Sequence, residues 1–148
     1  AVDPLAQRTY VLCDVFPVSE RRVQLADGKM VSPGTPILYY RANPANLIHN
    51  PPSLDRTSAC IYDARDNIPI VNLGRLADAT KAPAARNVHW LAADVKGPGF
   101  DYFYDYTRDR RLPTTAVDWP YRPDSYLLIS AGMDGIYGTE DDIRNFGQ

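Results

Sequence analysis

The chain has 148 residues, the size of a single domain, and we expect residues 1–148 to fold as one unit. Its hydrophobic fraction of 45% and charged fraction of 23% are typical of globular proteins and exclude disorder throughout the chain. The net charge of −2 excludes the strongly basic surface of a nucleic-acid-binding protein. Ten tyrosines, 13 prolines and 9 glycines predict an irregular fold built from short elements.

The first third of the sequence predicts a helix start and two short strands. Residues 3–4, an aspartate followed by a proline, are typical of a helix N-terminus, because an acidic N-cap precedes a proline at the first helical position. Residues 23–25 alternate in polarity, and the Asp-Gly pair at 27–28 predicts a turn directly after them. Residues 36–41, with the sequence PILYYR, predict a second short strand.

Few regular elements are expected in the middle of the chain. Residues 42–58 are rich in asparagine, proline and serine and predict a loop, whereas residues 59–62 predict a short strand. Residues 68–73 are apolar, but their proline excludes a central strand. Asn87 is a good N-cap for a helix that reaches Val95, where two glycines and a proline follow.

The stretch 100–106, FDYFYDY, is the aromatic centre of the sequence. Helical spacing brings Tyr102 near Tyr106, whereas strand spacing places alternate aromatic residues on one face, so both conformations stay open. The rings favour either core packing or an exposed platform for a glycan, a peptide or a neighbouring subunit. The candidate binding residues of such a platform are Tyr102, Tyr104, Trp119 and Tyr121.

The C-terminal part combines the clearest strand with an acidic loop. Residues 125–130, SYLLIS, predict a strand, and residues 131–148 predict a loop whose glycines permit sharp turns. Four carboxylates fall within the nine residues 134–142 and would repel one another unless a cation lies among them. Oxygen ligands on a flexible loop suit Ca²⁺ rather than zinc. An ordinary acidic surface turn is the alternative.

Motifs of catalysis are missing from the sequence. Neither His49 nor His89 lies in an HExxH pattern, and no GxSxG, Walker or GxGxxG motif occurs. We therefore assign no catalytic residue and expect a protein that is not an enzyme. Cys13 and Cys60 lack the spacing of metal ligands, and they form either a disulfide in an exported protein or two buried thiols.

The C-terminal sequence resembles a known family. A strand at 126–131, the turn GMDG at 132–135 and the segment GTEDDI at 138–143 are similar to the C-terminus of pseudopilins. The likeness is greatest to the major pseudopilin of type II secretion systems and to related type IV pilin-like proteins, where this ending forms a calcium-binding loop. Residues 31–40, VSPGTPILYY, resemble the segment that leads into the first strand in that family.

The resemblance implies a fold and a set of calcium ligands. The fold is α+β: a pilin-like antiparallel sheet with short helices and a large irregular insertion over residues 42–120. The N-terminal transmembrane helix of the family is expected upstream of Ala1, where the chain begins without a signal peptide or an initiator methionine. The implied calcium ligands are the carboxylates of Asp134, Asp141 and Asp142 and the carbonyl oxygens of Ile129, Ile136 and Thr139.

The resemblance also implies a structural function. The chain would be a subunit of a type II secretion pseudopilus or a type IV pilus-like fibre, in which bound Ca²⁺ stabilises the C-terminal loop. Its partners would be other pilin or pseudopilin subunits and proteins of the secretion machinery. It would lie in the bacterial cell envelope, anchored in the inner membrane by the upstream helix, with the domain in the periplasm or on the cell surface. The alternative is a secreted or cell-surface binding module, with glycans as candidate ligands, that carries a structural calcium site.

Overall fold

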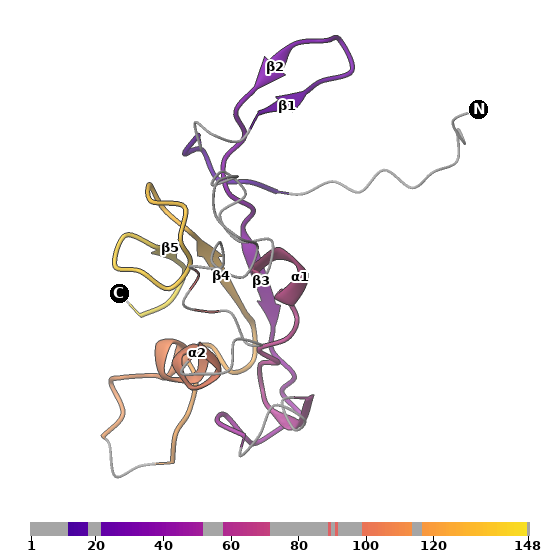
Figure 1. Cartoon of the computed structure of the whole chain (residues 1–148). Coiled ribbons are helices and arrows are strands. Elements are labelled where there is room, and N and C mark those ends of the chain that lie inside the picture. Colours follow the sequence, from indigo (N-terminus) through magenta and orange to yellow (C-terminus); the bar gives the residue numbers. More distant parts are fainter. Residues whose placement is uncertain are drawn as a thin grey trace, which may run out of the picture.

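The computed structural model describes residues 12–17, 22–51, 58–71, 89, 91, 99–113 and 117–147. These residues form a mixed structure with a three-stranded antiparallel sheet and short helices (Figure 1). No helix among them is long and apolar enough to cross a membrane. The elements in chain order are β1 (Val23–Gln24), β2 (Met30–Val31), β3 (Leu38–Arg41), α1 (Ile68–Val71), α2 (Gly99–Thr107), β4 (Tyr126–Ser130) and β5 (Ile143–Arg144).

The main sheet has the strand order β3-β4-β5, with β4 in the centre. Leu38 pairs with Ile129 and Tyr40 pairs with Leu127 across β3 and β4, and all four side chains are buried on one face. The residues between them point to the other face, because side chains alternate along a strand. The strands predicted at residues 36–41 and 125–130 are confirmed as β3 and β4, which begin at Leu38 and Tyr126.

β1 and β2 form a separate antiparallel hairpin that projects away from the main sheet (Figure 1). The turn lies at the Asp-Gly pair, as predicted. Gly28 has a φ of +83°, a left-handed conformation that suits glycine. Asp27 Oδ1 accepts a hydrogen bond from Lys29 N at 2.9 Å, so the turn is closed by local contacts alone.

The aromatic stretch whose conformation the sequence left open is the helix α2. Helical spacing directs Phe103 to the sheet, where its ring centroid lies 4.8 Å from that of Tyr40. One turn apart on another side of the helix, the rings of Tyr102 and Tyr106 stack with centroids 5.9 Å apart. Tyr104 points to a third side. α2 therefore presents aromatic rings to the sheet and to two further segments of the chain.

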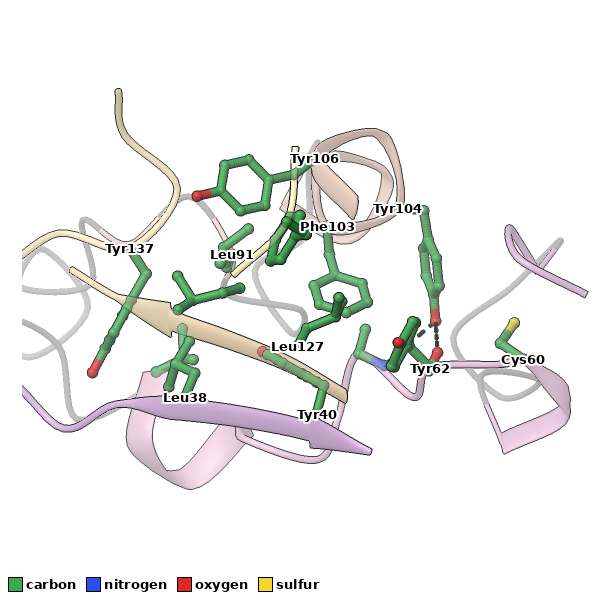
Figure 2. Close-up of a cluster of buried hydrophobic side chains, with 14 of the residues drawn as sticks. Leu38, Tyr40, Cys60, Tyr62, Leu91, Phe103, Tyr104, Tyr106, Leu127 and Tyr137 are labelled. Carbon is green, nitrogen blue, oxygen red and sulfur yellow. Dashed lines mark hydrogen bonds between the residues drawn. The ribbon is translucent and has the colours of Figure 1, made fainter. Parts of the chain in front are cut away.

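The hydrophobic core lies between α2 and the buried face of the main sheet (Figure 2). In Figure 2, Phe103 points toward Leu127 of β4, and Tyr104 points toward Tyr62. The described part of residues 42–120 is therefore integral to the core, rather than an insertion outside it. It supplies Ala42, Cys60, Ile61, Tyr62, Ala64, Val71, Leu91, Phe103, Tyr104 and Tyr106.

Two local predictions are wrong. Residues 59–62 form no strand, because Cys60 makes only a single bridge to Ile48 and the chain turns on both sides of it. The segment 131–148 was expected to be loop throughout, yet it contains β5, which pairs with the end of β4. Asn145 extends that pairing, since its side chain accepts from Leu128 N at 2.9 Å. A strand of two residues is too short to leave a periodic pattern in the sequence.

Other predictions lie outside the described residues. These are the helix that starts at residues 3–4 and most of the helix expected up to Val95, of which His89 and Leu91 are described and buried. Both cysteines are present as thiols. Cys60 lies in the core, whereas Cys13 is half-buried and forms a bridge with Pro36.

Candidate functional site

The candidate site is the loop of residues 131–142 between β4 and β5, called here the C-terminal loop. It turns at Gly132, Gly135 and Gly138, which have φ values of +61°, +68° and +99°. The chain returns so closely on itself that a Cβ at position 132 would lie 2.6 Å from Asp141 Oδ2. The glycines therefore make the sharp turns that the sequence predicts, and Gly132 admits no side chain without a shift of the loop.

Asp141 closes the start of this loop. Its Oδ2 accepts hydrogen bonds from Met133 N at 2.8 Å and Asp134 N at 3.1 Å. Its Oδ1 accepts from Thr139 Oγ1 at 2.6 Å. The hydrogen bond from Thr139, followed by those from the backbone amides, lowers the pKa of the Asp141 carboxyl. Asp141 thus stays ionised and uses both oxygens within the loop.

Asp134 and the predicted carbonyl ligands already make contacts within the protein. Asp134 Oδ1 accepts from Ile136 N at 2.7 Å, which makes a local Asx-type turn. The carbonyl oxygen of Ile136 lies 3.2 Å from Thr139 Oγ1 and shares the single proton of that hydroxyl with Asp141 Oδ1. The carbonyl of Thr139 accepts from Asp142 N at 3.5 Å. Ile129 lies inside β4, in register with residues of both neighbouring strands.

Asp142 differs from the other carboxylates of the loop because it is buried. Its Oδ2 accepts hydrogen bonds from Gly138 N at 2.8 Å and from the hydroxyl of Tyr106 in α2. Its Oδ1 is buried and has no hydrogen-bond partner among the described residues. Burial raises the pKa of Asp142 to about 6, although the hydrogen bonds from Tyr106 and from the backbone of Gly138 and Thr139, together with the charge of Arg144, act in the other direction. At neutral pH the charged form therefore carries one buried oxygen that lacks a partner.

Aromatic residues anchor the loop to the rest of the fold. Tyr102 Oη donates to the carbonyl of Gly138 at 2.6 Å, one helical turn from the contact of Tyr106. Tyr137 is buried, and its amide donates to His89 Nδ1 at 3.1 Å. Helical spacing, one of the two conformations that the sequence left open, brings Tyr102 near Tyr106, but neither the Tyr106 nor the Tyr137 anchor was predicted. The helical spacing was a usable signal, whereas nothing in the sequence indicated what the two rings would face.

The predicted calcium ligands fit a cation only in part. The described residues contain no cluster of three or more Asp, Glu, His or Cys side chains that has the geometry of a metal site. Asp134 and Asp141 are turned toward amides of the loop, and Asp142 is turned toward Tyr106. The buried Oδ1 of Asp142 is the atom that favours a cation. Further carboxylate ligands would have to exchange their present hydrogen bonds for the ion.

On the opposite side of α2, Tyr104 and His49 make hydrogen bonds with backbone groups of the described residues. Tyr104 Oη donates to the carbonyl of Tyr62 at 3.3 Å and accepts from Ala64 N at 3.4 Å. His49 Nε2 donates to the carbonyl of Tyr104 at 2.8 Å, which assigns its proton to that nitrogen. Burial lowers the pKa of His49, although its bond to the Tyr104 carbonyl acts in the other direction. This side is therefore held by neutral groups.

The candidate binding residues separate into two places. Tyr102 and Tyr121 line a groove of about 540 Å³ between α2 and the C-terminal residues. Tyr104 lies in the core, and Trp119 is half-buried against it. The structure thus brings two of the four predicted aromatic residues to one surface. Tyr106, Arg110 and Arg144, which were not among the predicted residues, line the same groove.

Comparison with known proteins gives no relative for this chain. No protein-family model matches it, and neither a curated protein nor a solved structure matches it. The role of the site therefore depends on its residues and contacts.

Proposed function

We propose that this chain is a subunit of a type II secretion pseudopilus or a type IV pilus-like fibre, with Ca²⁺ bound at its C-terminal loop. The order of the elements supports this function. β4 leads into a glycine-turned acidic loop, and the loop returns to the sheet as β5. The helix α2 covers the buried face of that antiparallel sheet.

The single observation that carries the calcium part is the buried Oδ1 of Asp142. A buried carboxylate oxygen without a partner costs free energy, and such atoms are rare in folded proteins. An ordinary acidic turn would leave this side chain in water. A cation beside Asp142 would satisfy the oxygen and offset the burial of its charge.

The residues for the ion come from the loop itself. Asp142 Oδ1 is the first ligand, and the carboxylates of Asp134 and Asp141 with the carbonyls of Ile136 and Thr139 are the further oxygens. Ca²⁺ suits such a set because it accepts six to eight oxygens in irregular geometry. When bound, the ion supplies the positive charge that offsets repulsion among these carboxylates. Binding to the folded state alone adds about 2.7 kcal/mol to the stability at one hundred times the Kd.

A structural role, rather than a catalytic one, is supported by the two histidines. His49 and His89 are both buried, and each makes a hydrogen bond to a backbone group. Neither is therefore placed as a general acid or base for a substrate in solvent. The partners that this function requires are other subunits of the fibre and proteins of the secretion machinery.

The coding sequence upstream of Ala1 tests the fibre function. We expect a prepilin cleavage site followed by a long apolar helix, which would anchor the subunit in the inner membrane before assembly. A cleavable signal peptide followed by other domains would contradict a fibre subunit. It would instead support a secreted or cell-surface binding module, the second candidate, which the groove beside Tyr102 and Tyr121 favours.

A further inference from the structure

The groove beside α2 continues into a second hollow. The first hollow has a volume of about 540 Å³ and the second about 280 Å³, and Tyr121, Arg144 and Gly147 line both. The combined groove runs from Glu140 of the C-terminal loop, past Arg144, to Arg122. Two adjoining hollows that share lining residues fit an extended ligand better than a compact one.

This groove is cationic although the chain as a whole has a net charge of −2. Among the described residues that line its two parts, Glu140 is the only acid, and the four bases are Arg110, Arg111, Arg122 and Arg144. Arg110 pairs with Asp105 at 3.0 Å, but both side chains are largely exposed. An exposed ion pair of this kind contributes little free energy, so a ligand carboxylate can compete for the arginine.

Aromatic rings hold two of these arginines in place. The guanidinium of Arg144 lies 4.8 Å from the ring centroid of Tyr106 and 5.5 Å from that of Phe146. The guanidinium of Arg111 lies 5.5 Å from the ring centroid of Tyr121, and it also forms a two-point ion pair with Asp109, with Nη2 at 2.6 Å from Oδ2. A ligand would therefore meet the guanidinium groups of Arg110, Arg122 and Arg144 rather than that of Arg111. The ring contacts restrict Arg111 and Arg144 before any ligand arrives. Arg111 also lies over the ring of Tyr121, a half-buried ring of the groove on which a sugar would otherwise stack, which favours a charged ligand over a neutral glycan.

We propose that this groove binds an extended acidic segment of a partner protein. A planar guanidinium recognises a carboxylate through two parallel hydrogen bonds, so aspartate and glutamate side chains match a row of arginines. Successive residues of an extended peptide advance about 3.3 Å each, which lets several carboxylates reach arginines along the groove. The arginines that would bind this segment are not among the proposed calcium ligands, although Thr139, one of those ligands, lines the groove. Binding of the segment therefore requires neither the ion nor an assembled fibre.

Fluorescence polarisation with a labelled peptide of about ten residues, alternating glutamate and alanine, tests the proposal. A peptide with lysine in place of glutamate is the charge control. We expect the acidic peptide to bind both in EGTA and in Ca²⁺, with an affinity that falls as salt is added. The double variant Arg110→Gln, Arg122→Gln removes one arginine from each part of the groove, and we expect at least about tenfold weaker binding.

Arg65→Gln is the matched control variant, because Arg65 is also exposed and paired with a neighbouring aspartate but does not line the groove. It should bind the acidic peptide as the wild type does, and thermal melting shows that both variants are folded. Equal loss of binding in the control variant, or equal binding of the lysine peptide, would overturn the proposal. Absence of acidic-peptide binding at millimolar concentration, or tighter binding of a polyuronate oligosaccharide than of the peptide, would overturn it as well.

Discussion

The two sides of α2 hold different parts of the chain by different means. Tyr104 holds the segment around Tyr62 and His49 through hydrogen bonds between neutral groups. Tyr102 and Tyr106 hold the C-terminal loop, and one of their contacts ends on the buried carboxylate of Asp142. The first side depends on packing and neutral hydrogen bonds, whereas the second also depends on the charge of Asp142. A single helix thus joins a side held by hydrogen bonds between neutral groups to a side that includes a buried carboxylate, at which we propose that a cation binds.

The largest loss of stability is expected from a substitution in the C-terminal loop, at the point where the chain packs most closely on itself. Gly132→Ala introduces a Cβ at a positive φ and within 2.6 Å of Asp141 Oδ2, so we expect a loss of about 3 kcal/mol in the free energy of unfolding. Urea unfolding measures this loss. Gly28→Ala in the hairpin has a positive φ but no atom nearer than 4.0 Å to the new Cβ, and should lose only about 1 kcal/mol. Equal losses would contradict the close packing of the loop.

Removal of one hydroxyl from each side of the helix sharpens the comparison. In EGTA at neutral pH, Tyr106→Phe should lose about 2 kcal/mol, because a buried carboxylate loses a hydrogen-bond donor. Tyr104→Phe should lose about 1 kcal/mol, since the acceptor that it leaves is the neutral carbonyl of Tyr62. Urea unfolding of the two variants checks this order. A larger loss for Tyr104→Phe would show that the charge of Asp142 does not matter for the loop side.

The two sides of α2 should contribute to the pH dependence of stability in opposite directions. Because burial lowers the pKa of His49, the unfolded chain takes up a proton at a higher pH than the folded protein does. The contribution of His49 to the free energy of unfolding is therefore fully present above the ordinary histidine pKa of about 6.5. It is lost as the pH falls through the lowered pKa. Asp118 and Arg108 act on the His49 ring with opposite signs.

Asp142 titrates in an overlapping range with the opposite sign. Its pKa is raised to about 6, so its contribution is present below the ordinary aspartate pKa and is lost as the pH rises through 6. Urea unfolding between pH 7.5 and pH 5 is therefore measured in the Asp142→Asn background. We expect the stability to fall with falling pH there, and His49→Gln should flatten that slope. If the free energy of unfolding still falls with pH in the His49→Gln variant, a group other than His49 takes up the proton.

The smallest effect is expected at the exposed end of the helix. Arg110→Gln removes the ion pair with Asp105, in which both side chains are largely exposed. We expect the free energy of unfolding to change by less than about 0.5 kcal/mol in urea titrations. A larger change would mean that surface charge contributes to how α2 is held, in addition to the tyrosine contacts.

Local pattern was sufficient to predict some elements and not others. The strands β3 and β4 and the Asp-Gly turn were predictable because strand-favouring composition and turn chemistry act over a few residues. The helix α2 was not, because FDYFYDY satisfies both periods, and the contact of Phe103 with Tyr40 across the core belongs to the helical arrangement.

The same limit applies to the candidate site. Its glycines predicted the turns of the C-terminal loop. The directions of its carboxylates depend on Tyr106, a residue 36 positions from Asp142, and on the amides that Asp141 caps. Contacts across such sequence distances leave no local signal, so the acids could be identified but not their partners.

The most direct test is thermal melting in EGTA, in millimolar Ca²⁺ and in millimolar Mg²⁺. The wild type is compared with Asp142→Asn and with the double variant Asp134→Ala, Asp141→Ala, and Tyr104→Phe serves as a control on the other side of α2. We predict that Ca²⁺, but not Mg²⁺, raises the Tm of the wild type and of Tyr104→Phe by several degrees, and that both aspartate variants lose this rise. An identical Tm of the wild type in EGTA and in Ca²⁺ would contradict a calcium site and would leave the loop closed by its own hydrogen bonds.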